Sequence, residues 1–167
     1  ISSGAITTLT EARVTVRCRV GDRTAEGRGA IYLSDLWAWP DPTRSHAERD
    51  AALRRLCETI AAQLPELCGG EGAHPLELGL RLHHAVCRLC VPTALCRGTP
   101  KSPEPAGQAG NGSPTSIPVL AQAMCLSPFD AALHDAVGLA LNRSAFDLYT
   151  DDEPLPSADR WLGPDGA

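Results

Sequence analysis

The sequence predicts an α+β fold, with a small antiparallel β-sheet (hairpin or meander) followed by a bundle of about three to four helices. Two observations predict it. Apolar and polar residues alternate with a period of two only within residues 12–33, and apolar stripes at helical spacing then recur from residue 45 to residue 141. Strands that precede a run of helices are typical of α+β domains with an antiparallel sheet.

Residues 12–33 show the pattern of two paired strands. One face of the first strand is apolar and carries Val14, Val16, Cys18 and Val20. The segment GDRT, residues 21–24, supplies turn chemistry, and AEGRGAIYL, residues 25–33, supplies the return strand. Gly27 and Gly29 interrupt the return strand, which predicts either a bulge or a close approach by another backbone.

The helical half begins after a loop at residues 34–44, which contains Trp37 and Trp39. Ser45 and Glu48 form a capping box, and Pro65 ends the helix. Its apolar stripe contains Leu53, Leu56, Ile60 and Leu64. A second helix starts at Pro75 and is apolar over a wide arc, so we expect it to be substantially buried.

A third helix follows residues 98–116, a proline- and glycine-rich insert that we expect to be flexible. Ser127 as N-cap, Pro128 at the first helical position and an acidic residue two positions later predict where this helix begins. Asn142 is expected to end it in the left-handed conformation. Three alanines along the helix allow close packing against another element: Ala132, Ala136 and Ala140.

Charge and composition restrict the class of protein. The net charge is −5, from 15 basic and 20 acidic residues, which argues against a nucleic-acid surface. No apolar run approaches the roughly 18–20 residues of a membrane span. The start of the sequence, ISSGAITTLT, has neither the basic nor the apolar region of a signal peptide, and the cysteine count of seven is odd. We therefore expect reduced thiols in a cytoplasmic protein.

Two groups of residues invite a chemical interpretation. Cys87, Cys90 and Cys96, with His83 or His84, include ligands that zinc prefers, but they lie in an apolar stripe where thiols pack as small apolar groups. His134 with Asp130 and Asp135 has the composition of an acid–base group, yet no nucleophile or glycine-rich loop accompanies it. We favour core packing for the first group and a helix-surface pair for the second, and assign no catalytic or metal-binding residue.

For the two tryptophans, a binding role and a structural role are about equally favoured. Trp37 and Trp39 stand in a loop with two prolines. Aromatic side chains in such a loop either line a pocket or an interface, or anchor the loop against the domain.

Two segments give the chain a resemblance to a known family. VTVRCRVGDRTAEGRGAIY looks like a two-strand element with a short polar turn and a G-x-G segment, and DAALHDAVGLALNRS contains the pattern D-x-A-L-x-D-x-x-G. This pattern falls on Asp130, Ala132, Leu133, Asp135 and Gly138. Together they resemble the N-terminal capping region of the enolase superfamily, in its mandelate racemase/muconate lactonizing enzyme branch. Leu139, where the family has a basic residue, and the insert at 98–116 are departures.

The resemblance implies a capping domain over residues 1–150, with residues 151–167 as a linker toward a (β/α)-barrel that this sequence does not contain. The complete protein would be an isomerase or lyase whose Mg²⁺-dependent barrel abstracts a proton α to a carboxylate. The cap would shape and close the substrate pocket, with Trp37 and Trp39 as its substrate contacts. No catalysis and no cofactor are expected of this chain alone. Its expected partners are the barrel in the same polypeptide, a small carboxylate substrate and, as an option, a second copy.

Two alternatives belong to other functional classes. A helical protein-binding module would dock a partner through residues 76–91, using the wide apolar arc of the second helix. A zinc-binding protein would use Cys87, Cys90, Cys96 and a histidine.

Overall fold

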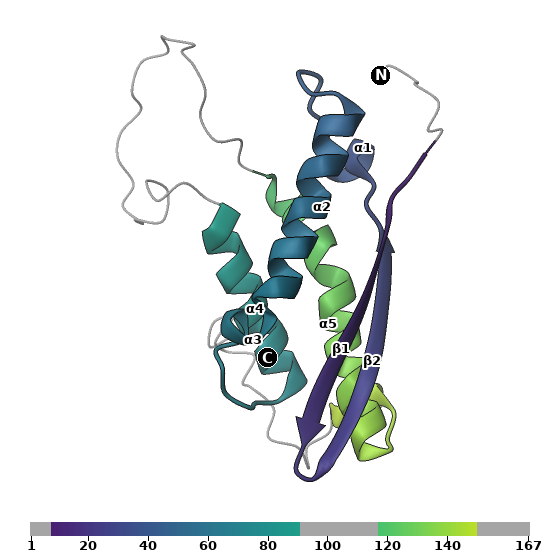
Figure 1. The fold of residues 1–167 in the computed structure, drawn as a ribbon, viewed down its shortest axis with the longest axis vertical. Helices are drawn as coiled ribbons and strands as arrows, with labels where there is room; N and C mark the ends of the chain where they lie inside the picture. Colours follow the sequence, from purple (N-terminus) through teal and green to yellow (C-terminus); the bar gives the residue numbers. More distant parts are fainter. Residues whose placement is uncertain (1–7, 91–116, 150–167) are drawn as a thin grey trace, which may run out of the picture.

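The computed structural model describes residues 8–90 and 117–149, and the fold is α+β, as predicted (Figure 1). A two-stranded antiparallel sheet comes first and the helices follow. The predicted insert at 98–116 and the predicted linker at 151–167 lie outside the described residues. Among the described helices, none combines the length and the apolar character that crossing a bilayer needs.

The hairpin is confirmed almost residue for residue. Strand β1 spans Glu11–Val20 and β2 spans Arg23–Tyr32, with Glu11 opposite Tyr32 and an uninterrupted register down to Val20 opposite Arg23. The turn needs only Gly21 and Asp22, and Gly21 has φ of 57°, a conformation that glycine adopts without a steric cost. No bulge interrupts this ladder, so the two glycines of β2 have the other predicted role.

Helix α5, Val119–Leu141, crosses β2 in direct backbone contact. A Cβ atom built on Gly27 would stand 2.1 Å from the backbone nitrogen of Ala136, and one on Gly29 would stand 2.0 Å from the carbonyl oxygen of Pro128. Real Cβ atoms never approach so closely, so only glycine fits at these two positions. The close approach predicted from the sequence is therefore confirmed, and α5 supplies the backbone.

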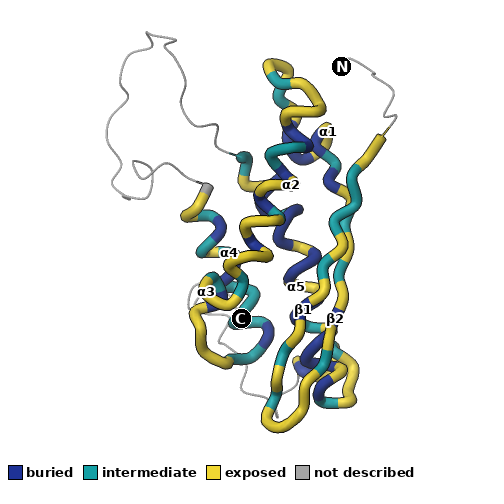
Figure 2. Tube along the Cα trace, viewed as in Figure 1, coloured by how far each residue is buried: buried dark blue, intermediate teal, exposed yellow. Residues whose placement is uncertain are grey.

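The remaining helices lie around α5 (Figure 1). They are α1 at Asp35–Ala38, α2 at His46–Ala62, α3 at Leu64–Leu67 and α4 at Pro75–Cys90, and a 3-10 turn, η1, spans Ala145–Leu148. Helix α5 touches both strands as well as α2 and α4, so it is the centre of the fold. Figure 2 shows the buried positions gathered along α5 and on the sides of α2 and α4. The largest fully buried apolar side chains are Phe129, Leu33, Leu53, Ile60, Leu82 and Leu148.

The predicted start of the third helix at Ser127 is wrong. Helix α5 already begins at Val119, and Pro128 lies inside it. Proline at this position leaves the carbonyl of Met124 without its helical donor. Apolar residues on both sides of Pro128 are buried in the same core, and this burial outweighs the local cap signal. The predicted end is confirmed, because Asn142 has φ 54° and ψ 43°, the left-handed conformation.

Two smaller expectations also change. The segment 34–44 is not wholly a loop, because it contains the short helix α1. Helix α4 is only half-buried: Leu82 and Val86 are buried, whereas Leu89 is 51% exposed. The reason is that α5 is the main helix that covers it, on one side. The capping box of α2 is confirmed, with the Ser45 hydroxyl accepting from the Glu48 N–H and the Glu48 carboxylate accepting from the Ser45 N–H.

Candidate functional site

The two tryptophans expected to contact substrate lie in different surroundings. Trp37, on α1, is 63% exposed, whereas Trp39, at the end of that helix, is 4% exposed. The Arg44 guanidinium carbon stands 5.8 Å from the centre of the Trp39 ring. Trp39 also forms part of the wall of an open groove of about 690 Å³ along α2. The structure thus presents Trp37 to solvent and anchors Trp39, and the substrate role of both stays a prediction.

A buried carboxylate holds α1 against α2. Asp35 is 1% exposed, and its two oxygens accept hydrogen bonds of 2.8 Å from Arg49 Nε and from His46 Nδ1. Arg49 is buried as well, and its Nη1 donates to the backbone carbonyls of both Asp41 and Arg44. A buried ion pair is tolerated when its other donors and acceptors have partners, as both Asp35 oxygens and Arg49 Nη1 do. The segment that carries Trp37 is therefore fixed at both ends.

Sequence reasoning missed this network. Asp35, His46 and Arg49 are separated by 11 and 3 positions, and no local pattern links an aspartate after a strand to an arginine in a later helix. The capping box at Ser45 was readable and places His46 and Arg49 in the first turn of α2. Only the packing of α1 on α2 brings Asp35 to them.

Electrostatics in the same segment favour the ordered conformation. The hydroxyl and the backbone N–H of Thr43 both donate to Asp41 and lower the pKa of its carboxyl group. The Ser45 hydroxyl and backbone N–H do the same for the pKa of Glu48. Both carboxylates are thus held charged, and Glu48 lies in the first turn of α2, where a negative charge is favoured by the helix dipole.

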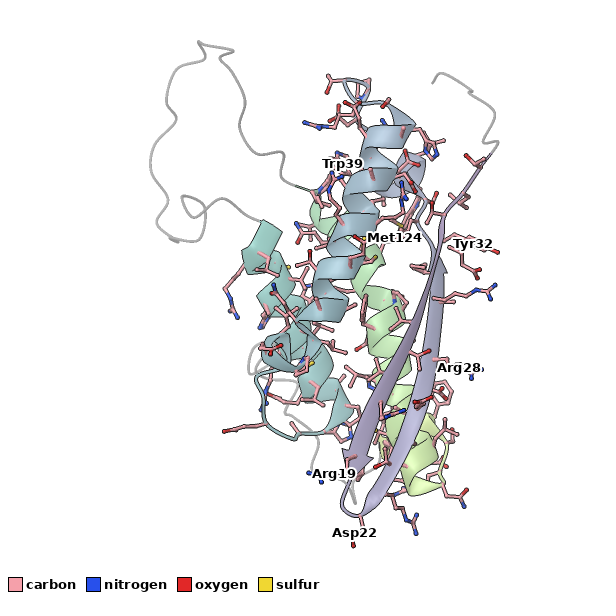
Figure 3. The ribbon with its side chains drawn as sticks, viewed as in Figure 1. Arg19, Asp22, Arg28, Tyr32, Trp39 and Met124 are labelled. Atoms are coloured by element: carbon pink, nitrogen blue, oxygen red, sulfur yellow. The ribbon has the colours of Figure 1, made fainter. Side chains whose placement is uncertain are left out.

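Apolar side chains are exposed around α1. They come from the segment before β1, the end of β2 and α1 itself, and we call them the α1-end patch: Leu9, Tyr32, Leu36 and Trp37. The segments meet because the Leu33 N–H donates to the Thr10 carbonyl at 2.8 Å, which continues the hairpin ladder. In Figure 3, Tyr32 lies toward this end of β2 and points away from the helices. Four exposed large apolar residues on neighbouring segments make this end a candidate for a surface that a partner covers.

His134 and Asp130 lie one helical turn apart on α5 and approach each other as expected, with 3.8 Å between His134 Nδ1 and Asp130 Oδ1. Asp135 accepts a 2.8 Å hydrogen bond from the backbone N–H of Arg28. His134 Nδ1 donates to the carbonyl of Asp130 at 2.9 Å, and its ring stacks on Tyr149 with 5.8 Å between centres. Burial, together with the charge of Asp130, raises the pKa of Tyr149, so its hydroxyl stays protonated.

The surroundings of the cysteine and histidine residues of α4 favour core packing over zinc binding. Cys87 Sγ is 3.8 Å from His83 Nε2, and burial raises the pKa of the Cys87 thiol, which disfavours the thiolate that a zinc ligand requires. Cys96 and the side chain of Cys90 lie outside the described residues. Within the described residues, no three His, Cys, Asp or Glu side chains are grouped as a metal ion needs.

Comparison with family profiles, with curated proteins and with solved structures gave no match. The geometry of the α1 end therefore carries the functional argument.

Proposed function

We propose that this chain is the capping region of a mandelate racemase/muconate lactonizing enzyme-like protein, and that the α1-end patch covers the substrate pocket of a (β/α)-barrel. The observation that carries the proposal is the exposure of Trp37 on a helix that a buried network holds rigid. A cap needs this combination, because its apolar contact surface has to keep its shape while the pocket beneath it opens and closes.

The chemistry assigned to the cap is the exclusion of water. Removing water from a pocket strengthens the electrostatic interactions that stabilise an enolate on the barrel. Trp37 and Leu36 supply apolar area for this purpose, and the Asp35–Arg49 ion pair fixes where that area points. The described residues do not fit a magnesium site, so Mg²⁺ would be held by the barrel, and no step of this proposal passes through the metal.

The experiment uses the polypeptide encoded by the reading frame continued beyond codon 167. We expect that frame to encode a barrel and its product to exchange the α-proton of small carboxylates with deuterium from D₂O. Trp37→Ala should raise KM about tenfold, because it removes most of an aromatic contact area. Phe146→Ala is the matched control, since Phe146 is 84% exposed but lies in η1, at the other end of α5.

A frame without barrel strands would refute the proposal. So would a Trp37→Ala protein that behaves like the Phe146→Ala control.

A further inference from the structure

The outer edge of β1 is unpaired among the described residues. The sheet there has only two strands, and β1 lies on the side of the hairpin that faces α2 (Figure 1). The 2.8 Å bond from the Leu33 N–H to the Thr10 carbonyl marks these two as a hydrogen-bonded pair. In an antiparallel ladder such pairs alternate, so the even-numbered residues of β1 bond to β2. The odd-numbered residues direct their N–H and C=O groups away from it.

A groove runs along this edge. It measures about 410 Å³, and every residue from Thr10 to Val16 lines it. Because neighbouring side chains of a strand point to opposite faces, seven consecutive residues can line one groove only where the edge of the strand opens into it. The floor contains the core residues Val16, Leu33 and Phe129, and α2 forms the opposite wall.

Of the features that keep edge strands apart, β1 has only charged side chains, at Glu11, Arg13, Arg17 and Arg19. Strand β1 is ten residues long, without proline or a bulge, and its inward-facing residues Ala12, Val14 and Val16 are apolar. Its outward-facing charges are of both signs. Glu11 bonds to Arg13, and Arg17 bonds to Glu26 on β2, but both arginines are largely exposed, so a second strand can compete for these charges.

We propose that the edge of β1 is a self-association surface, on which β1 of a second copy pairs antiparallel about a two-fold axis at Val14. In this register Glu11 stands opposite Arg17 of the second copy, and the reverse, and the odd-numbered edge groups bond to one another. Moving the axis to Arg13 places Arg13 opposite itself, and moving it to Thr15 places Arg13 opposite Arg17. Of these three registers, only the one at Val14 joins opposite charges without a like-charge pair.

The opposite wall of the groove also carries both charges. Helix α2 contributes one residue of each charge there, Arg54 and Glu58. An isologous contact requires such self-complementarity, because each copy presents the same surface to the other. The result is a continuous four-stranded sheet with helices on one face. This inference does not depend on the proposed capping function.

Sedimentation velocity of the full chain from about 1 µM to about 1 mM should show a monomer–dimer equilibrium. Thr15→Pro should leave only monomer, because it removes an N–H that points away from β2. Ala30→Pro is the matched control: Ala30 is opposite Arg13, so its N–H points away from β1, on the far edge of the hairpin. Its dimer should persist, and circular dichroism checks that both variants are folded.

A charge exchange tests the register without proline. Glu11→Arg and Arg17→Glu should each weaken the dimer about tenfold, because each creates two like-charge pairs, and the double variant should restore it. A chain that stays monomeric at every concentration would overturn the proposal. This holds whether or not hydrogen exchange shows that another segment of the same chain protects the edge amides. A dimer that all these variants leave equally strong would overturn it too.

Discussion

The carboxylate of Asp135 on α5 accepts a 2.8 Å hydrogen bond from the backbone N–H of Arg28 on β2. Arg28 is opposite Thr15, an odd-numbered residue of β1, so its N–H points out of the two-stranded ladder. The central helix thus supplies the acceptor that a third strand would otherwise provide. This contact, with the two glycines beside it, sets how the hairpin lies on α5.

Asp135→Ala should therefore lower the free energy of unfolding by about 1 kcal/mol, since the bond to a charged acceptor is lost at an exposed position. Asp135→Asn keeps an oxygen acceptor, so its free energy of unfolding should fall by less. Urea unfolding of both variants measures the difference. Equal losses would show that the hydrogen bond does not stabilise the fold.

The glycines of β2 should be far more sensitive than other glycines of the chain. Gly27→Ala and Gly29→Ala each place a methyl group against the α5 backbone, and we expect a loss of about 3 kcal/mol or more. Gly72→Ala is the control, because a Cβ there has no neighbour within 4 Å, and it should change stability by less than about 0.5 kcal/mol. Thermal unfolding would contradict the close packing if all three variants melted together.

The Asp35–Arg49 pair should show strong coupling. Asp35→Leu leaves the Arg49 charge buried without its partner, and Arg49→Met does the same to Asp35, so each should cost about 3–5 kcal/mol. The double variant Asp35→Leu with Arg49→Met should recover much of that loss, since both charges are gone. A double-mutant cycle by denaturant unfolding measures the coupling, and additive losses would contradict a direct buried pair.

The stability of the fold should depend on pH through the Glu48 carboxyl group. Hydrogen bonds from Ser45 lower the pKa of Glu48 below its ordinary value of 4.5, so the folded state favours the charged carboxylate. This contribution is complete above pH 4.5 and is lost as the pH falls through the lower folded pKa. Glu48→Gln should be less stable at neutral pH and should lose less stability below pH 4.5. Parallel acid-unfolding curves would contradict the assignment.

The sequence allowed the local features of this fold to be predicted, and tertiary contacts decided the rest. The hairpin, the capping box and the left-handed Asn142 each depend on residues within a few positions of one another. The helix start predicted at Ser127 was wrong because it rested on a local cap signal. Helix α5 continues through Pro128 because its residues on both sides are buried against other elements. The exposure of α4 likewise depends on how much of it other elements cover.

The same division applies to the site. The aromatic character of residues 34–44 was readable, but the opposite exposures of Trp37 and Trp39 were not, because they depend on the way α1 packs on α2. The Asp35 network was out of reach for the same reason. Residues far apart in sequence become a cluster only when the helices are placed.

The fluorescence of Trp37 tests the central claim, that the α1 end is a cover, most directly. With Trp39 and Trp161 replaced by phenylalanine, Trp37 is the only tryptophan of residues 1–167, and in the longer protein any tryptophan beyond residue 167 is replaced as well. Its emission is compared between this chain and the polypeptide continued beyond codon 167. We predict exposed-type emission from the chain alone and a shift to shorter wavelength in the longer protein, because the patch becomes covered. Identical emission from the two would contradict the claim.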